Sequence, residues 1–203
     1  MVELSRNLRY ESETGTAHSA VGVKVWGERQ LVISAAHATP HTRWGRLKAA
    51  DSKTDAIALH LGQILGGVTI LPLLPQDDDP NFDIAETGLY KSTLASLLNE
   101  ESVLIDIHGM RDGFGSDLCI GTGGIQPIPT DLISLCDSLI SCFAQVGMSA
   151  KIDYPFAASQ SGTIAAFGRS RCRISLQLEL SVASRNPPQL GLTFGALVAA
   201  LSE

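Results

Sequence analysis

The chain has 203 residues, enough for one domain with a sizeable core, and its 44% hydrophobic and 18% charged residues exclude a disordered chain and a coiled coil. A net charge of −6, with 15 Lys and Arg residues that form no run, argues against a nucleic-acid surface. No apolar stretch reaches the ~20 uninterrupted residues that a membrane span requires. We therefore expect a single domain over residues 1–203 that binds neither nucleic acid nor a membrane.

The N-terminus begins MVELSRNLRYESETG, which is polar and charged and lacks the apolar core of a signal peptide. This composition indicates a cytoplasmic protein. The cysteines include no C-x-x-C spacing and are interpreted as buried thiols; they are Cys119, Cys136, Cys142 and Cys172.

The first third of the sequence predicts two strands and a helix. Two apolar, β-branched runs, Ala20 to Trp26 and Leu31 to Ala36, flank Gly27-Glu28-Arg29 and predict a β-hairpin. Asp51 to Leu65 has helical apolar spacing and is closed by Gly66-Gly67, with Asp51 as an N-cap or first-turn residue.

The later elements alternate between the two types. We expect strands at Val68 to Leu74, Ser102 to Ile107, Asp117 to Gly121 and Arg173 to Val182, and helices at Asp83 to Asn99, Asp131 to Val146 and Phe194 to Leu201. The acidic run Asp77-Asp78-Asp79 between two prolines is typical of a solvated loop. The order predicts an α/β fold whose central mixed sheet has helices on both faces.

Two histidines come at the ends of predicted strands, His37 in LVISAAHATPH and His108 in VLIDIHGMRDG. A histidine at a strand end reaches a crevice from a fixed backbone, and neutral imidazole is the commonest zinc ligand. Asp106 lies two residues before His108, where it would face the same side and orient the imidazole. The pair predicts a metal site, although a lone histidine of this kind is more often structural.

Glu179 interrupts an apolar strand in SLQLELSV, and alternation places it with Gln177 on one face. On an exposed face the carboxylate would be unremarkable. A partly buried Glu beside a metal site would make a general base.

These segments resemble the N-formylglutamate amidohydrolases, a family related in fold to the zinc carboxypeptidases. AHATPH is similar to the family's Pro-His-x-Gly segment, with Ala36 in place of the Pro and Thr39 in place of the Gly. LIDIHGMRDG resembles its Asp-x-His segment, and SLQLELSVASR resembles the strand of the catalytic glutamate. The resemblance implies a zinc carboxypeptidase-like (phosphorylase/hydrolase-like) fold, one Zn²⁺ per chain, His37 and His108 as the first and last ligands, and Glu179 as the catalytic residue.

The second ligand is left open by the sequence, because no H-x-x-E follows His37. GRLKAADSKTDAIAL resembles the stretch in which amidohydrolase relatives place an acidic residue at a helix start. Asp51 is the first candidate, Asp55 the second, and His41 on the loop after His37 a third.

The expected activity is hydrolysis of an amide bond in an N-acyl (N-formyl-type) amino acid or a related small substrate. Zinc together with Arg111, or alternatively Arg43, would stabilise the developing oxyanion. Arg43, His41 and Arg185 would bind the substrate, since an arginine suits a substrate carboxylate. Two alternatives stay open: a carboxypeptidase-like or polyglutamyl hydrolase that acts on short peptides, and a metal-free binding module that retains the fold.

Overall fold

The computed structural model describes residues 21–125 and 127–202. In this part of the chain a mixed sheet has the strand order β1-β5-β2-β6-β9-β7-β8. Its strands are β1 (Val21–Val25), β2 (Leu31–Ser34), β5 (Val68–Pro72), β6 (Val103–Gly109), β7 (Leu118–Gly121), β8 (Ala150–Ile152) and β9 (Ile174–Leu180). The N-terminal segment on which the expected cytoplasmic location was based lies outside the described residues.

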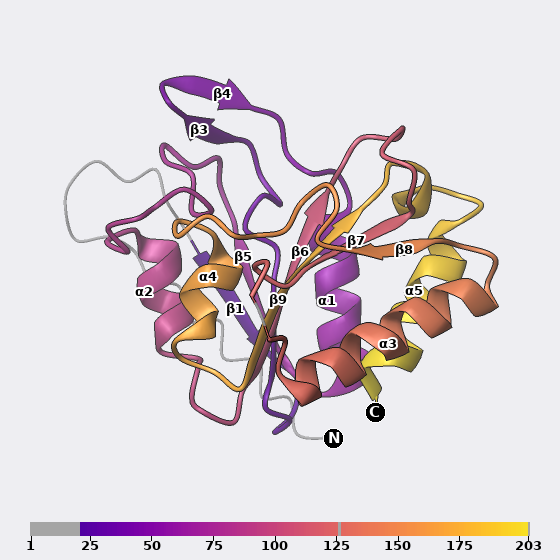
Figure 1. Cartoon of the computed structure of the whole chain (residues 1–203). Helices are drawn as coiled ribbons and strands as arrows, with labels where there is room; N and C mark the ends of the chain where they lie inside the picture. The colour runs from indigo at the N-terminus through magenta and orange to yellow at the C-terminus, as the bar shows by residue number, and fades with distance from the viewer. Residues whose placement is uncertain (1–20, 126, 203) are drawn as a thin grey trace.

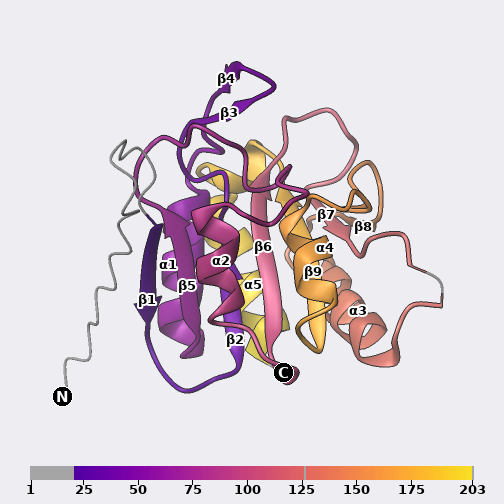
Figure 2. The ribbon, with the colours of Figure 1, turned by 90° about the vertical axis from the view of Figure 1, so that its left-hand side faces the viewer.

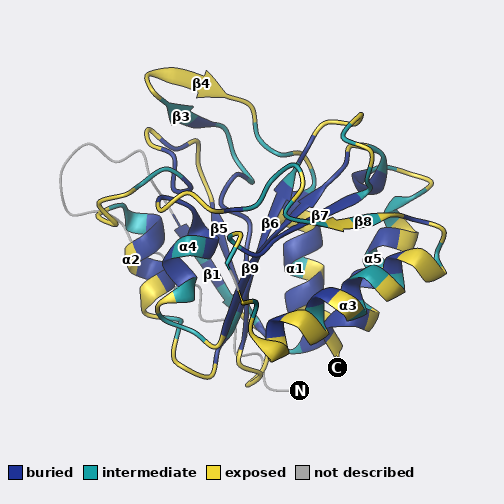
Figure 3. Ribbon diagram, in the orientation of Figure 1, coloured by how far each residue is buried: buried dark blue, intermediate teal, exposed yellow. Residues whose placement is uncertain are grey.

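Helices cover both faces of this sheet (Figures 1 and 2). One core cluster joins α1 (Thr54–Leu65), α3 (Thr130–Gln145) and α5 (Leu190–Ser202) to strand residues such as Ile105 and Ile107. The other joins α2 (Leu89–Ala95) and α4 (Ile164–Arg169) to residues such as Leu104 and Ile70. Figure 3 shows the buried strands between the two helical layers. The expected fold class is therefore confirmed.

The predicted hairpin between β1 and β2 is wrong, because β5 lies between them and pairs antiparallel with β1 and parallel with β2. The loop that joins β1 to β2 is bound to the turn leading into β5: Trp26 N–H donates to Gly67 O at 3.0 Å and Arg29 N–H to Gly66 O at 3.1 Å. A Cβ on Gly27 would lie 2.8 Å from Gly66 O, so the two turns nest only because glycine is present. The sheet is mixed because β1 and β7 run against their neighbours β5 and β9.

Several boundaries also differ from expectation. The helix expected over Asp83 to Asn99 is confined to α2, and α1 begins after Asp51, with Lys53 at its N-cap. The elements that the sequence patterns missed are all short: a hairpin of β3 (His41–Arg43) and β4 (Arg46–Lys48), strand β8, helix α4 and the 3₁₀ helix η1 (Ala183–Arg185). Runs this short give too few repeats to show a period.

Strands β5, β2, β6 and β9 are mutually parallel, so their carboxyl ends meet at one edge of the sheet. The β3–β4 hairpin projects beyond that edge (Figures 1 and 2). In open α/β sheets this edge is where ligands bind. Among the described residues, none of the helices has the length and apolar character needed to cross a bilayer.

Candidate metal centre

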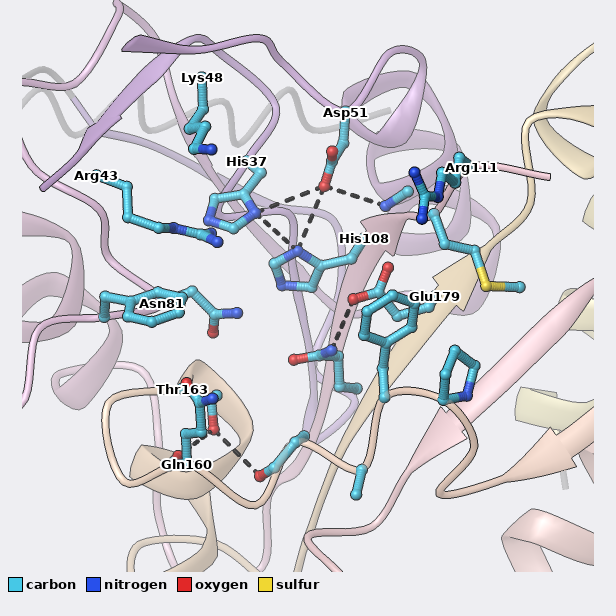
Figure 4. Close-up of a pocket in the computed structure, with 18 of the residues that line it drawn as sticks. His37, Arg43, Lys48, Asp51, Asn81, His108, Arg111, Gln160, Thr163 and Glu179 are labelled. Carbon is cyan, nitrogen blue, oxygen red and sulfur yellow. Dashed lines mark hydrogen bonds and ion pairs between the residues drawn. The ribbon is translucent and has the colours of Figure 1, made fainter. Parts of the chain in front are cut away.

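Three side chains converge at the carboxyl edge of the sheet (Figure 4). His37 follows β2 and Asp51 precedes α1, whereas His108 is the last but one residue of β6 rather than a residue after it. The Nδ1 atoms of the two histidines are 3.0 Å apart, and Asp51 Oδ2 lies 3.5 Å from His37 Nδ1 and 3.4 Å from His108 Nδ1. The three ligand atoms thus form a nearly equilateral triangle.

This triangle fits a tetrahedral metal ion. Ligands about 2.0–2.1 Å from zinc in a tetrahedral arrangement lie about 3.3 Å from one another, close to the three observed separations. The donor set of two imidazoles and one carboxylate is one that zinc accepts, and the described residues supply no fourth ligand to this group. The residues present therefore fit an ion with one position left for solvent or substrate.

His108 is oriented by a buried chain of hydrogen bonds. Its Nε2–H donates to Asp106 Oδ2 at 2.7 Å, and Ser34 Oγ donates to Asp106 Oδ1 at 2.6 Å. Although burial alone would lower the pKa of His108, the adjacent Asp106 carboxylate holds it well above the ordinary value. When His108 is neutral, as a metal ligand must be, a proton on Nε2 leaves the Nδ1 lone pair directed at the cluster, and Asp106 lies on the side of the strand where the sequence pattern placed it.

His37 has a matching carboxylate partner that the sequence reasoning missed. Its Nε2 lies 2.8 Å from Asp79 Oδ1, and Arg43 Nε donates to Asp79 Oδ2 at 2.5 Å. Burial would raise the pKa of Asp79, but the hydrogen bonds from His37 and Arg43 hold it far below its usual range. The interpretation of the acidic run as a solvated loop is correct for Asp77 and Asp78, which are exposed, and wrong for Asp79, which is buried.

Asp51 is held between the two histidines by backbone contacts. Gly109 N–H donates to its Oδ2 at 3.1 Å, and its own N–H donates to His37 O at 2.9 Å. Burial alone would raise the pKa of Asp51, whereas hydrogen bonds from the two imidazoles hold it far below the usual range. Its carboxylate therefore does not cap α1. Asp55 lies in the first turn of α1, is exposed, and is not part of the cluster.

His41 is stacked on His37, with ring centroids 3.9 Å apart. Its Nδ1 lies 3.4 Å from Thr39 O, while its buried Nε2 has no hydrogen-bond partner among the described residues. Burial, reinforced by His37, lowers the pKa of His41 to about 4. Its Nε2 is 3.6 Å from Asp79 Oδ2, an oxygen already bound by Arg43. His41 therefore lies beside the cluster as a neutral, buried base.

Glu179 lies on β9 directly beside His108 in the strand register. Its side chain is buried, and its Oε1 accepts a hydrogen bond from Gln177 Nε2 at 2.9 Å. Burial raises the pKa of Glu179. Alternation along the strand thus places Glu179 and Gln177 on the cluster side of the sheet, as expected.

A cavity of about 890 Å³ opens above these residues. The cationic side chains in its wall are Arg43, Lys48 and Arg111, and its aromatic side chains are Phe82, Phe114 and Phe156. Arg43 lies over the Phe82 ring, with its guanidinium carbon 4.0 Å from the centroid. Acidic groups in the wall are confined to Asp51 and Glu179 among the described residues, so the cavity suits an anionic ligand.

Arg185, expected to bind substrate, is placed outside this lining. Its buried guanidinium donates to backbone carbonyls of Ser52 at 2.6 Å and Met110 at 3.3 Å, and its Nε to Leu180 O at 3.2 Å. These bonds join the loop after Asp51 to the ends of β6 and β9. Arg185 thus supports the cluster from behind.

Asn81, Gln160 and Thr163 also line the cavity and were missed (Figure 4). Asn81 Oδ1 accepts the N–H of Ile164 at 2.7 Å, which joins the loop after β5 to the start of α4. The signal that could have found Asp79 and Asn81 is their position: both follow the carboxyl end of a buried parallel strand, the argument applied to His37.

No protein-family model matches the sequence, and no curated protein matches it. Solved structures do match in fold. A bacteriophage poly-gamma-glutamate hydrolase aligns with 15% identity and a TM-score of 0.58, covering 90% of this chain and 88% of its own. An N-formylglutamate amidohydrolase from Ralstonia eutropha aligns with 14% identity and a TM-score of 0.61, covering 89% and 95%.

A metallo-carboxypeptidase from Burkholderia cenocepacia aligns with 12% identity and a TM-score of 0.56, covering 95% of this chain and 63% of its own. At such identities the likeness establishes the fold. The zinc carboxypeptidase-like architecture that the sequence motifs implied is therefore confirmed.

Proposed function

We propose that the chain is a metal-dependent hydrolase, with one Zn²⁺ per chain, that cleaves the amide bond of an N-acyl (N-formyl-type) amino acid or a related small substrate. The observation that carries the proposal is the convergence of His37 Nδ1, Asp51 Oδ2 and His108 Nδ1 beside the buried carboxylate of Glu179. In this proposal residues 1–203 form one catalytic domain. Its unpaired cysteines support the cytoplasm as its location.

When bound, the ion supplies Lewis acidity, which polarises the scissile carbonyl and makes water more acidic. Glu179 acts as the general base and then as the general acid: it takes a proton from the attacking water and gives it to the nitrogen of the departing amine. Burial supports this role, because it raises the pKa of Glu179 and so makes its carboxylate a stronger proton acceptor. Gln177 keeps one Glu179 oxygen fixed through its amide N–H.

The cationic wall of the cavity supports a substrate that carries a carboxylate. Arg43 is held by Asp79 and Phe82 at the His37 side, and Arg111 lies on the loop that follows β6. We assign Arg111 to the developing oxyanion and Arg43 to the substrate carboxylate, with His41 as a buried acceptor beside them. Since Arg185 donates to backbone carbonyls, its proposed contribution is to position Asp51.

A second candidate, a carboxypeptidase-like or polyglutamyl hydrolase acting on short peptides, is favoured by the size of the cavity. About 890 Å³ lies near the upper end of the range for small-molecule pockets, roughly 300–1,000 Å³. A short glutamyl peptide would fill more of this space than one acyl amino acid.

Metal analysis and a substrate panel test the proposal together. The purified protein, reconstituted with zinc, should bind one equivalent and hydrolyse N-formyl or N-acetyl amino acids. Stoichiometric zinc with turnover of glutamyl peptides alone would move the assignment to the second candidate. A protein that retains no metal after reconstitution would contradict both enzyme functions and favour a metal-free binding module.

A further inference from the structure

The β3–β4 hairpin presents one face made of basic residues. In its register Arg43 is paired with Arg46, and His41 with Lys48, so these four side chains point to the same side. Thr42 and Leu47 form the other register pair and point away. The turn residues Trp44 and Gly45 both have positive φ, as in the type I′ turn that is common in two-residue hairpins.

Like charges directly opposite each other destabilise a strand pair. Arg43 is balanced by Asp79, but none of the described residues forms an ion pair with Arg46 or Lys48. Both side chains are exposed, in a chain whose acidic residues outnumber its lysines and arginines by 21 to 15. Arg46 and Lys48 thus carry positive charges without an ion-pair partner among the described residues, although the chain as a whole is acidic.

The position of this face connects it to the candidate active site. Arg43 and Lys48 line the cavity and lie on its His37 side (Figure 4). Arg46 continues the positive charge toward the hairpin tip, where Trp44 is 82% exposed with its ring edge-on to Phe82. Trp44 has a φ of 51°, which is uncommon for a bulky residue. Cationic and aromatic side chains therefore continue from the candidate metal site to the tip of the β3–β4 hairpin.

We propose that the basic face of the β3–β4 hairpin binds the carboxylates of an acidic substrate chain, at residues beyond the one whose amide bond is cleaved. The inference rests on the second candidate of the proposed function, hydrolysis of short peptides, and gives those peptides a chemical class, chains of acidic residues. Arg46 and Lys48 are the selecting residues, and Trp44 offers a surface on which the methylene groups of such a chain can pack.

The role of the hairpin in binding can be tested without turnover by using the Glu179→Gln protein reconstituted with zinc. The probes are N-acetyl-tri-L-glutamate, the equally long N-acetyl-tri-L-glutamine and the short N-acetyl-L-glutamate, measured by calorimetry at low salt. The triglutamate should bind most tightly. Adding Arg46→Gln and Lys48→Gln should weaken its binding about tenfold, since each exposed charge pair contributes up to a few-fold, and about 0.5 M salt should remove most of the preference.

The matched control removes the same charge elsewhere, through Arg29→Gln and Arg173→Gln. Both residues are exposed and line a separate hollow near the amino ends of β2 and β9. Control affinity for triglutamate should stay within about twofold of the parent, as expected for distant exposed charges.

Equal affinity for the three probes, or an equal loss in the control protein, would overturn the inference. So would hairpin-dependent binding to phosphatidylserine vesicles in place of triglutamate, because the surface would then recognise a membrane. Turnover is measured separately on the same compounds with the wild-type protein. Hairpin-dependent binding of triglutamate without hydrolysis of any amide would contradict the proposed function and leave the binding surface intact.

Discussion

At the scale of single residues, each histidine of the cluster directs one ring nitrogen toward the candidate metal position and the other toward a buried carboxylate. His108 is bound to Asp106, and His37 to Asp79. Such partners fix the tautomer and ring orientation, and their loss usually weakens metal affinity. Since Asp79 comes from an acidic run, its neighbour Asp77 offers a test within the same loop.

Asp79→Asn should lower zinc affinity about 10- to 100-fold, because an amide holds the His37 ring less firmly and leaves Arg43 without its counter-charge. Asp77→Asn removes the same charge from an exposed position and should leave zinc affinity unchanged. Competition with a chromogenic chelator measures both. Equal affinities in the two variants would contradict the role given to Asp79.

Glu179→Gln should retain one zinc per chain and lose at least about 100-fold in kcat, since the amide cannot accept the water proton. Glu101→Gln, at an exposed position, serves as the control. Metal content and the rate of amide hydrolysis are measured on the same samples. Hydrolysis by the Glu179 variant at the control rate would exclude it as the general base.

His41 makes a prediction about pH. Its folded pKa of about 4 lies below the 6.5 of an unperturbed imidazole, so the unfolded chain binds a proton first as the pH falls. The stability contributed by His41 is complete above pH 6.5 and is lost between about 6.5 and 4. His41→Phe keeps a ring against His37 and should flatten the fall in Tm of the metal-free protein over this interval. Parallel Tm profiles for the two proteins would refute the assignment.

At the scale of elements, strand ends were easier to predict than strand neighbours. The apolar runs located β1, β2, β5, β6 and β9 within a few residues, because strand burial, on both faces in the central strands, leaves a plain compositional signal. Pairing depends on contacts far apart in sequence, and the glycine contact that places β5 between β1 and β2 has no local pattern. Adjacent runs were therefore paired wrongly.

The end of β6 offers a test of how backbone packing supports the cluster. A Cβ on Gly109 would lie 2.5 Å from Arg185 Cζ, and Gly109 N–H also donates to Asp51. Gly109→Ala should therefore cost about 1–3 kcal/mol of unfolding free energy and also weaken zinc binding.

Gly195→Ala is the matched control, because it lies within α5 with no atom within 4 Å of the added Cβ. It should stabilise the protein by about 0.5–1 kcal/mol, the usual gain of replacing a helical glycine. Urea unfolding of both variants gives the comparison. Similar effects of the two substitutions would show that the space around Gly109 is unimportant.

At the scale of the whole molecule, the three candidate ligands and the side chains around them come from segments that are distant in sequence. These segments are the loops after β2 and β5, the residues before α1, and the strands β6 and β9. An ion bound there should stabilise the folded state by about 2.7 kcal/mol at a free concentration 100 times its Kd, which raises the Tm by roughly 5–10 °C. A chelator should reverse the shift, and the Asp79→Asn protein should show a smaller one at equal zinc. A Tm insensitive to zinc would contradict a site built across these elements.

The same geometry explains how much of the site could be predicted. His37, His108 and Glu179 could be named as candidates because strand ends and alternation have local signatures, and Asp51 because its segment resembles a known family. Asp79 was missed since its burial depends on the fold of a loop between prolines, where neighbouring acidic residues are exposed. Arg185 was expected to bind the substrate, because no sequence pattern shows that a loop arginine will donate to buried backbone carbonyls.

The insertion of β5 between β1 and β2 also constrains how the chain folds as it is synthesised. Among the residues that the structure describes, β1 pairs with β5 alone, from Val21 opposite Pro72 to Val25 opposite Val68. During synthesis β1 must therefore wait until residue 72 has emerged from the ribosome, and its backbone groups lack their sheet partner in the meantime. The 42 intervening residues, 26–67, set this delay, and over that interval β1 is open to pairing with another chain or to binding by a chaperone.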